Sequence, residues 1–134
     1  MDKYPSIEWN KDNDNFEVLN KTDLLISDYS GIIFDYSLIF EKPIIYTSSD
    51  FDDSIYDSTW LNAKPWTFKK LREIGTELNE NNLYQLKELI NDCIYRKKNK
   101  KKIEQIKKEC WANEGNAAST IVDYIMQKIN MINN

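Results

Sequence analysis

Three short segments between residues 23 and 47 constrain the fold more than any other part of the sequence. Asp23–Ser27 (DLLIS) is a compact apolar run with a polar end, which is typical of a strand buried on both faces. Gly31–Phe40 (GIIFDYSLIF) follows almost at once, and its nearly continuous apolar character predicts a buried helix. Pro43–Thr47 (PIIYT) is a second β-branched and aromatic run. Strand, buried helix and strand together predict an α/β fold around a parallel sheet.

The other segments predict a helical C-terminal third and few further strands. Ser6–Trp9 and Thr76–Leu78 have weak strand character, and Asn15–Lys21 predicts a short helix capped by Asn13 or Asp14. A loop extends to about Pro65, and later helices are expected at 67–74, 80–97, 103–111 and 117–132, the first ended by a left-handed Gly75. A doubly wound nucleotide-binding domain has about five or six strands. The sequence therefore predicts one partial domain over residues 1–134, the C-terminal portion of such a fold.

The composition excludes several classes of chemistry. The chain of 134 residues has no histidine, which excludes imidazole acid–base catalysis, a Ser-His-Asp or Cys-His arrangement and any His-ligated metal within it. Two cysteines, Cys93 and Cys110, are too few for a disulfide framework or a cysteine zinc site, and we expect reduced packing residues of an intracellular protein. No apolar run approaches the roughly 20 residues of a membrane span. The sequence points to no metal and no cofactor.

Charge is distributed unevenly along the chain. Residues 1–60 hold 4 Lys against 13 Asp or Glu, whereas residues 96–108 (RKKNKKKIEQIKK) hold 8 Lys or Arg and one Glu. This lysine-rich run has two interpretations. A solvated helix junction is the commoner case, and the alternative is a patch that rests on an anionic membrane surface or a polyanionic substrate. The formal net charge of −4 gives no global attraction to nucleic acid, and no nucleic-acid partner is expected.

Polar residues follow both predicted strands, at the edge where ligands bind in open parallel sheets. Ser30 and Gly31 lie at the start of the buried helix, where main-chain N–H groups lack partners within the helix. The positive helix end, a hydroxyl and a residue without a side chain suit a phosphate or diphosphate. Asp35 lies about one turn later in an otherwise apolar helix, and ribose hydroxyls are suitable partners for its carboxylate. The second strand is followed by a further candidate loop, Ser48, Ser49 and Asp50.

Each of these residues also has a simpler structural role. Asp28 or Ser30 can cap the helix, and Asp35 can face solvent or pair with Lys42. Three aromatic residues of the following stretch are expected to pack an irregular loop rather than to stack on a base: Trp60, Trp66 and Phe68. No Gly-rich phosphate loop and no G-x-G-x-x-G is present. The residues alone therefore predict only half of an α/β nucleotide-type domain.

The segment Thr22–Tyr46, TDLLISDYSGIIFDYSLIFEKPIIY, resembles the signature stretch of the CDP-glycerol glycerophosphotransferase family, the teichoic-acid polymerases and primases of bacterial cell envelopes. That family shows an apolar strand ending in S/T-D-Y-S-S/G, a helix that contains F-D-Y/F, and then K-P-I-I before a hydrophobic residue. Asp50 is similar to the acidic residue that often follows the second strand. The C-terminal WANEGNAASTIVDYI resembles the family's closing segment, so the likeness runs from about Tyr4 to Ile129.

The resemblance implies both a fold and a reaction. Such proteins have two Rossmann-like domains of glycosyltransferase-B type, of which the C-terminal one holds the donor nucleotide. They transfer a polyol phosphate from a CDP-polyol to a hydroxyl group of a membrane-bound acceptor chain and release CMP. The resemblance thus implies a CDP-glycerol or related CDP-polyol donor, and a lipid-linked polymer acceptor bound through an N-terminal domain that this chain lacks. It also implies a cytoplasmic location, with residues 96–108 as a candidate peripheral contact to the inner face of the membrane.

Site residues can be carried over from the family position by position. Ser30 and the main-chain amides of Gly31 and Ile32 would hold the donor diphosphate, and Asp35 would bind the ribose. The loop that presents these groups would be shaped by its two preceding residues, Asp28 and Tyr29.

Two departures from the family pattern limit what this chain is expected to do. Gly31 replaces the second Ser of the common D-Y-S-S version, which removes a hydroxyl and keeps the amide. The family's histidines, a base and a phosphate ligand, lie upstream and have no counterpart here. We therefore expect no catalytic residue in this chain and no transfer by the chain alone. Two other functions fit the residues: part of a nucleotide-sugar glycosyltransferase of the same fold, and a non-catalytic α/β interaction module. A preference for CDP does not follow from these residues.

Overall fold

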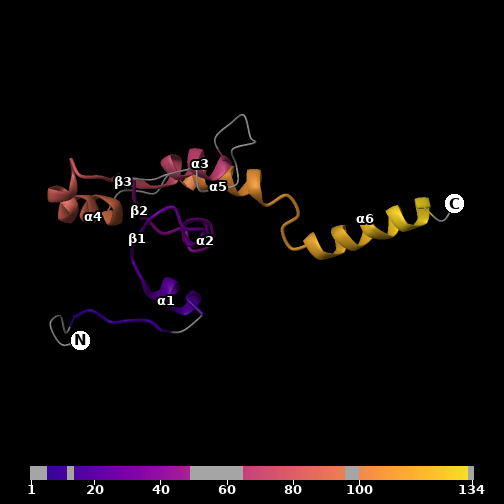
Figure 1. The fold of residues 1–134 in the computed structure, drawn as a ribbon, viewed down its shortest axis with the longest axis horizontal. Coiled ribbons are helices and arrows are strands. Elements are labelled where there is room, and N and C mark those ends of the chain that lie inside the picture. Colours follow the sequence, from indigo (N-terminus) through magenta and orange to yellow (C-terminus); the bar gives the residue numbers. More distant parts are fainter. Residues whose placement is uncertain (1–5, 12–13, 49–64, 96–99, 133–134) are drawn as a thin grey trace. The chain divides into compact units, whose positions relative to one another are not determined.

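A computed structural model describes residues 6–11, 14–48, 65–95 and 100–132 of the chain. In these residues three short strands form one open sheet in the order β1-β2-β3, and both neighbouring pairs are parallel (Figure 1). The strands are β1 (Leu25–Ser27), β2 (Ile44–Thr47) and β3 (Thr76–Leu78). The predicted α/β fold with a short parallel sheet is confirmed.

Helices connect the strands and form the C-terminal third. Helix α1 (Phe16–Lys21) precedes β1, α2 (Ile32–Ile39) connects β1 to β2, and α3 (Trp66–Ile74) lies between β2 and β3 in the chain. After β3 come a 3₁₀ turn, η2 (Leu83–Gln85), and the helices α4 (Leu86–Tyr95), α5 (Lys100–Cys110) and α6 (Ala117–Ile132). The chain divides into two compact units, residues 1–96 and 97–134. The sheet lies in the first unit and α5 and α6 in the second.

The core of the first unit lies against one face of the sheet. Ile44 and Tyr46 share that face because side chains alternate along a strand, and Ile45 points to the opposite one. The buried members of this cluster come from β2 and from each of the first three helices: Ile44, Tyr46, Leu19, Ile33, Tyr36 and Leu71. Apolar burial of this kind is the main favourable term in folding. It holds α2 against the sheet and thereby positions the end of β1.

Polar contacts tie the C-terminal end of α1 to this core. The Tyr36 hydroxyl donates a hydrogen bond to the Thr22 carbonyl at 3.0 Å and accepts one from the Thr22 hydroxyl at 3.2 Å. The Lys42 ammonium donates to the carbonyls of Leu19, Asn20 and Thr22, at 2.7 Å for Thr22. The last carbonyls of a helix lack partners within it, and a cation near them is favourable. Lys42 therefore fastens α1 beside α2 and does not serve as a partner of Asp35.

Two of the strand predictions are wrong. The segment Ser6–Trp9 forms no strand in the structure, and its side chains are exposed, so this short piece has no pairing partner among the described residues. Asp23–Ser27 does not give a strand buried on both faces, because Ile26 in β1 is 44% exposed. β1 lies at the end of the strand order of the described sheet. The third strand is Thr76–Leu78, and its parallel pairing with β2 confirms the weak strand character predicted there.

The predicted left-handed conformation of Gly75 is also wrong. Gly75 ends α3 in an extended conformation, with φ −119° and ψ 168°, and its N–H donates to the Leu71 carbonyl at 2.9 Å. A Cβ atom at this position would lie 2.9 Å from side-chain atoms of Ile44 and Tyr46. Glycine is therefore required here for the close approach of α3 to the sheet and not for its freedom of φ.

The largest difference from prediction after β3 is the start of α4; α5 spans Lys100–Cys110, against a predicted helix at 103–111. The amphipathic pattern predicts a helix from Glu80, but α4 begins at Leu86 after the 3₁₀ turn. The Asn82 side chain accepts the N–H of Asn79 at 2.8 Å and donates to the carbonyl of Glu77 at 2.9 Å. Asparagine side chains that bond nearby main-chain groups in this way compete with helix formation.

The cysteines have different environments. Cys93 is partly buried on α4, where its thiol lies 3.2 Å from the Thr76 hydroxyl of β3. Cys110 is the last residue of α5 and is exposed, and its Sγ lies 3.1 Å from the Ile106 carbonyl oxygen. The packing role predicted for both residues therefore applies only to Cys93.

Candidate functional site

The segment between β1 and α2 is a tight turn with unpaired main-chain donors. The Asp28 carboxylate accepts the N–H of Ser30 at 3.1 Å, and the Ser30 carbonyl accepts the N–H of Ile33 at 3.2 Å. Gly31 is the N-cap of α2 and no side chain caps that helix, so neither Asp28 nor Ser30 has the capping role left open by the sequence. Within the described part of the chain, the N–H groups of Gly31 and Ile32 donate no hydrogen bond.

The start of α2 is also accessible. Ser30 and Gly31 are exposed, and Ile32 is half-buried. A Cβ atom added to Gly31 would meet nothing within 4 Å, so there is open space directly beside the two free N–H groups. The first N–H groups of a helix carry a positive partial charge and commonly bind anions. This turn has the geometry of an anion-binding site.

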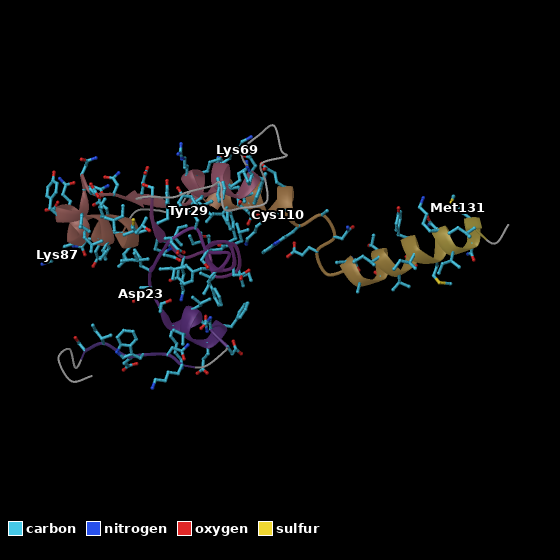
Figure 2. All side chains as sticks on the ribbon, in the orientation of Figure 1. Asp23, Tyr29, Lys69, Lys87, Cys110 and Met131 are labelled. Atoms are coloured by element: carbon cyan, nitrogen blue, oxygen red, sulfur yellow. The ribbon has the colours of Figure 1, made fainter. Side chains whose placement is uncertain are left out.

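Tyr29 anchors the turn to the rest of the first unit. Its ring lies edge-on to Phe68 of α3 at a centroid distance of 5.4 Å and to Tyr46 of β2 at 6.2 Å (Tyr29 is labelled in Figure 2). Burial raises the pKa of the Tyr29 phenol above its usual range, and the nearby Arg72 guanidinium opposes that rise. The Trp66 ring packs on the Phe34 ring in a tilted arrangement, with an interplanar angle of 36° and a centroid distance of 5.8 Å. Trp60 lies outside the described residues.

A cavity of about 460 Å³ lies beside the start of α2, between α1 and α2. We call it the α1–α2 cavity, and its lining residues are Asp14, Asn15, Phe16, Leu19, Ile32 and Asp35. Asp35 is exposed, one turn along α2 from Gly31 and Ile32. Of the two simpler roles that the sequence left open for Asp35, exposure to solvent is therefore the one observed, and its carboxylate lines an open cavity.

The end of β2 differs from the end of β1, because its polar residue is already engaged. The Ser48 hydroxyl hydrogen-bonds the Glu77 carboxylate, and its N–H donates to the Leu78 carbonyl at 3.3 Å. The pairing of Tyr46 with Glu77 across β2 and β3 brings Glu77 to this position. Ser49 and Asp50, the other two residues predicted here, lie outside the described residues.

Some cavity residues could not be found from the sequence pattern. Asp14 carries only the signal of a helix cap and Asn15 only that of a helix start, whereas Phe16 and Leu19 carry that of apolar contacts. Their place beside Asp35 depends on how α1 packs against α2, about 15 to 20 residues along the chain. That packing is a tertiary contact without a local sequence signature.

The chain matches a known protein family over most of its length. The sequence profile of CDP-glycerol:poly(glycerophosphate) glycerophosphotransferases matches residues 6–127, which is most of the chain. The chain belongs to this family. The resemblance noted over Thr22–Tyr46 is thereby confirmed, and glycerophosphotransferases catalyse group transfer.

Two curated proteins also match this glycerophosphotransferase-family chain over a short stretch. They are the teichoic acid ribitol-phosphate polymerases TarK and TarL of Staphylococcus aureus (strain NCTC 8325 / PS 47). Each is 49% identical over 39 residues, which is 29% of this chain and 7% of the relative. The match therefore covers a small part of either polymerase. No solved structure shows a significant match to the chain.

A positively charged surface lies on α5, outside the candidate site. The described part of the lysine-rich run lies on α5, with Lys101 and Lys108 exposed, and the Lys107 ammonium 5.5 Å from the centre of the Trp111 ring. In the described ranges, no helix combines the length and hydrophobicity needed to span a membrane. The same residues contain no group of three or more side chains suited to hold a metal ion.

Proposed function

We propose that this chain is the donor-nucleotide-binding part of a CDP-polyol phosphotransferase, of glycosyltransferase-B type, in teichoic acid or related cell-envelope polymer synthesis. The open start of α2 supports the proposal most. There the free N–H groups of Gly31 and Ile32 lie beside the Ser30 side chain, with Asp35 one turn along the same helix. Family membership supports the same reaction class.

The diphosphate of the donor would bind at the start of α2. A helix of eight residues presents about half a positive elementary charge at this end, and unpaired N–H groups point along its axis. The hydroxyl of Ser30 adds a neutral donor from the same turn. Asp28 and Tyr29 would keep the turn in place, Asp28 through its bond to the Ser30 N–H and Tyr29 through its ring contacts.

Asp35 would accept hydrogen bonds from the ribose hydroxyls. Its carboxylate is exposed within the α1–α2 cavity, and an ionised carboxylate accepts several hydrogen bonds without donating any. A ribose joined to a diphosphate at Ile32 would reach one helical turn, about 5 Å, along α2. Diphosphate and ribose would therefore bind to successive turns of one helix.

Transfer would proceed by in-line attack of an acceptor hydroxyl on the β-phosphorus of the donor. A new oxygen–phosphorus bond forms, and the bond from the β-phosphorus to the bridging oxygen breaks, so that CMP leaves with the electron pair. The helix end and its N–H groups would stabilise the charge that develops on the leaving CMP. The proton of the acceptor hydroxyl needs a base, and this chain contains no histidine to take it. We expect no turnover by the chain alone, since the base and the acceptor site would belong to a further part of the enzyme.

The polyol could be glycerol or ribitol. The family description names glycerol phosphate, whereas the two curated relatives are ribitol-phosphate polymerases. The acceptor would be a lipid-linked polymer. A cytoplasmic location at the inner face of the membrane would follow from that acceptor.

Calorimetric titration of the chain with CDP and CDP-glycerol tests the proposed site. Ser30→Ala and Asp35→Ala should each weaken binding by about tenfold or more, since each removes a hydrogen bond that involves a charged group. Ser6→Ala and Asp123→Ala remove the same groups from exposed positions outside the site and should leave binding unchanged. Equal binding in all four variants would contradict the proposal, and tighter binding of UDP or GDP than of CDP would favour a nucleotide-sugar transferase.

The exposed lysines of α5 favour a second activity, contact with an anionic lipid surface. Opposite charges near a membrane surface attract by about 1 kcal/mol per Lys or Arg. A double variant, Lys101→Gln with Lys108→Gln, should therefore reduce sedimentation with phosphatidylglycerol vesicles, and added salt should reduce it further. Lys11→Gln with Lys69→Gln is the matched control in the other unit. If the α5 variant sedimented with the vesicles as the unsubstituted chain does, the lysine-rich run would be a solvated helix junction and not a membrane contact.

A further inference from the structure

The α1–α2 cavity extends past the residues assigned to the donor's phosphates and ribose. Ile32 and Asp35 line its α2 side, whereas Asp14, Asn15 and Phe16 line its α1 side and have no role in the proposed function. Its volume of about 460 Å³ lies within the usual range for small-molecule sites, about 300–1,000 Å³. The α1 side is therefore available for a part of the ligand beyond the ribose.

The α1 residues of the cavity are held in place by contacts with one another and with residues outside it. The Phe16 ring lies 5.9 Å from the Phe40 ring, centroid to centroid, and the residue is 51% exposed. The Asp14 carboxylate is oriented by the N–H of Phe16, which it accepts at 2.9 Å. The Asn15 side-chain oxygen accepts a hydrogen bond from the Asn10 amide at 3.3 Å, which leaves the Asn15 NH₂ as a donor.

This set of groups combines an aromatic face, an acceptor and a donor. Flat bases stack on aromatic side chains, and they are distinguished by hydrogen bonds to their edges. Cytosine presents an amino donor, whereas the equivalent position of uracil carries an acceptor oxygen. The Asp14 carboxylate accepts hydrogen bonds and donates none, so it would attract the cytosine amino group and repel the uracil oxygen. The Asn15 NH₂ would meet the adjacent acceptor of cytosine.

We propose that the α1 side of this cavity is the base site of the donor nucleotide, and that Asp14 selects cytosine over uracil there. This inference rests on the proposed function, because it takes the ribose to be bound by Asp35. Phe16 would supply stacking to either pyrimidine, and Asn15 and Asp14 would contact the base edge. Residues at the start of α1 would therefore select the base, whereas residues at the start of α2 would bind the phosphates and the ribose.

Titration of the 134-residue chain with CMP and with UMP, followed by NMR or calorimetry, tests this inference. The unsubstituted chain should bind CMP about tenfold or more tightly than UMP, the discrimination expected of one good base-edge contact. Asp14→Asn should bring the two affinities close together, since an amide can serve either base. Phe16→Ala should weaken both nucleotides, by about five- to 100-fold, and leave their ratio unchanged.

Matched variants distinguish failure of this inference from failure of the proposed function. Asp123→Asn and Tyr95→Ala change an exposed carboxylate and an exposed ring outside the cavity and should bind as the unsubstituted chain does. Circular dichroism of each variant establishes that it folds. A CMP-to-UMP ratio unchanged by Asp14→Asn, or a ratio near one in the unsubstituted chain, would overturn the base site. If Asp35→Ala still abolished CMP binding in that case, the proposed function would stand. If the unsubstituted chain bound neither nucleotide, both the base site and the proposed function would be overturned.

Discussion

Helices α2 and α6 are both rich in apolar residues, but their environments differ. Four of the eight residues of α2 are buried, namely Ile33, Tyr36, Ser37 and Leu38. No residue of α6 is buried, although its stripe of Ile121, Val122, Ile125, Met126 and Ile129 is typical of a core-facing helix. These side chains are between 45% and 58% exposed. Met131, labelled in Figure 2, is 72% exposed.

The difference shows that apolar periodicity predicts a helix and its apolar face but not what covers that face. The residues of α2 are apolar on nearly all sides, and the helix connects two strands that pair with each other. Chain connectivity and apolar burial together therefore place α2 against the sheet. Among the described residues α6 has no such constraint, since it does not connect two strands of the sheet. Substitutions in the two helices should accordingly have very different effects on stability.

Removal of a buried side chain from α2 should have the largest effect. Ile33 is fully buried, at 0% exposed, so Ile33→Ala leaves a cavity and should lower the free energy of unfolding by about 2–5 kcal/mol. Urea denaturation followed by circular dichroism measures this change. An effect below about 1 kcal/mol would mean that α2 is not part of the core.

Close packing of α3 on the same sheet face gives the second largest effect. An alanine Cβ at position 75 would press on Ile44 and Tyr46, so Gly75→Ala should cost about 1–3 kcal/mol. Gly31→Ala is the matched control for stability, because Gly31 has φ −58° and open space around its Cα. That variant should be neutral or slightly more stable, by about 0.4–1 kcal/mol. Equal effects of the two substitutions would contradict the described packing.

Tyr36→Phe should have a smaller effect that depends on pH. The variant loses the hydrogen bond from the hydroxyl to the Thr22 carbonyl, which also accepts from Lys42, and should lose about 0.5–1.5 kcal/mol. Burial raises the pKa of the Tyr36 phenol above its usual range. The unfolded chain then releases this proton first, so native stability falls as the pH rises above about 10. Between neutral pH and a pH above about 10, the free energy of unfolding should therefore fall less in Tyr36→Phe than in the unsubstituted chain. An identical decrease in both chains would exclude this linkage.

The smallest effect is expected in α6. Ile125 is 49% exposed, and Ile125→Ala should change the free energy of unfolding by no more than about 0.5 kcal/mol. The same denaturation experiment measures it, with Ile33→Ala as the contrasting variant. A loss of 2 kcal/mol or more would show that the apolar face of α6 is covered in solution, and the contrast between the two helices would then disappear.

Much of the candidate site could be predicted from local sequence. The run from Asp23 to Phe40 predicts a strand, a turn and a helix, and the turn places Ser30 and Gly31 at a helix start. The boundary of that helix is correct to within one residue. The environment of Asp35 could not be predicted, because exposure depends on which side of α2 meets the sheet. The engagement of Lys42 with the end of α1 likewise depends on a contact 20 to 23 residues apart.

The sequence by itself determined the α/β class, the helix that follows DLLISDYSG and the family, because these depend on local periodicity and on the order of a few residue types. Only the tertiary structure decided the α1–α2 cavity, the exposure of Ile26 and the extended conformation of Gly75. Each of these depends on distances between segments that are remote along the chain. Such distances follow from the joint packing of helices on a sheet, in which every side chain competes for the same space.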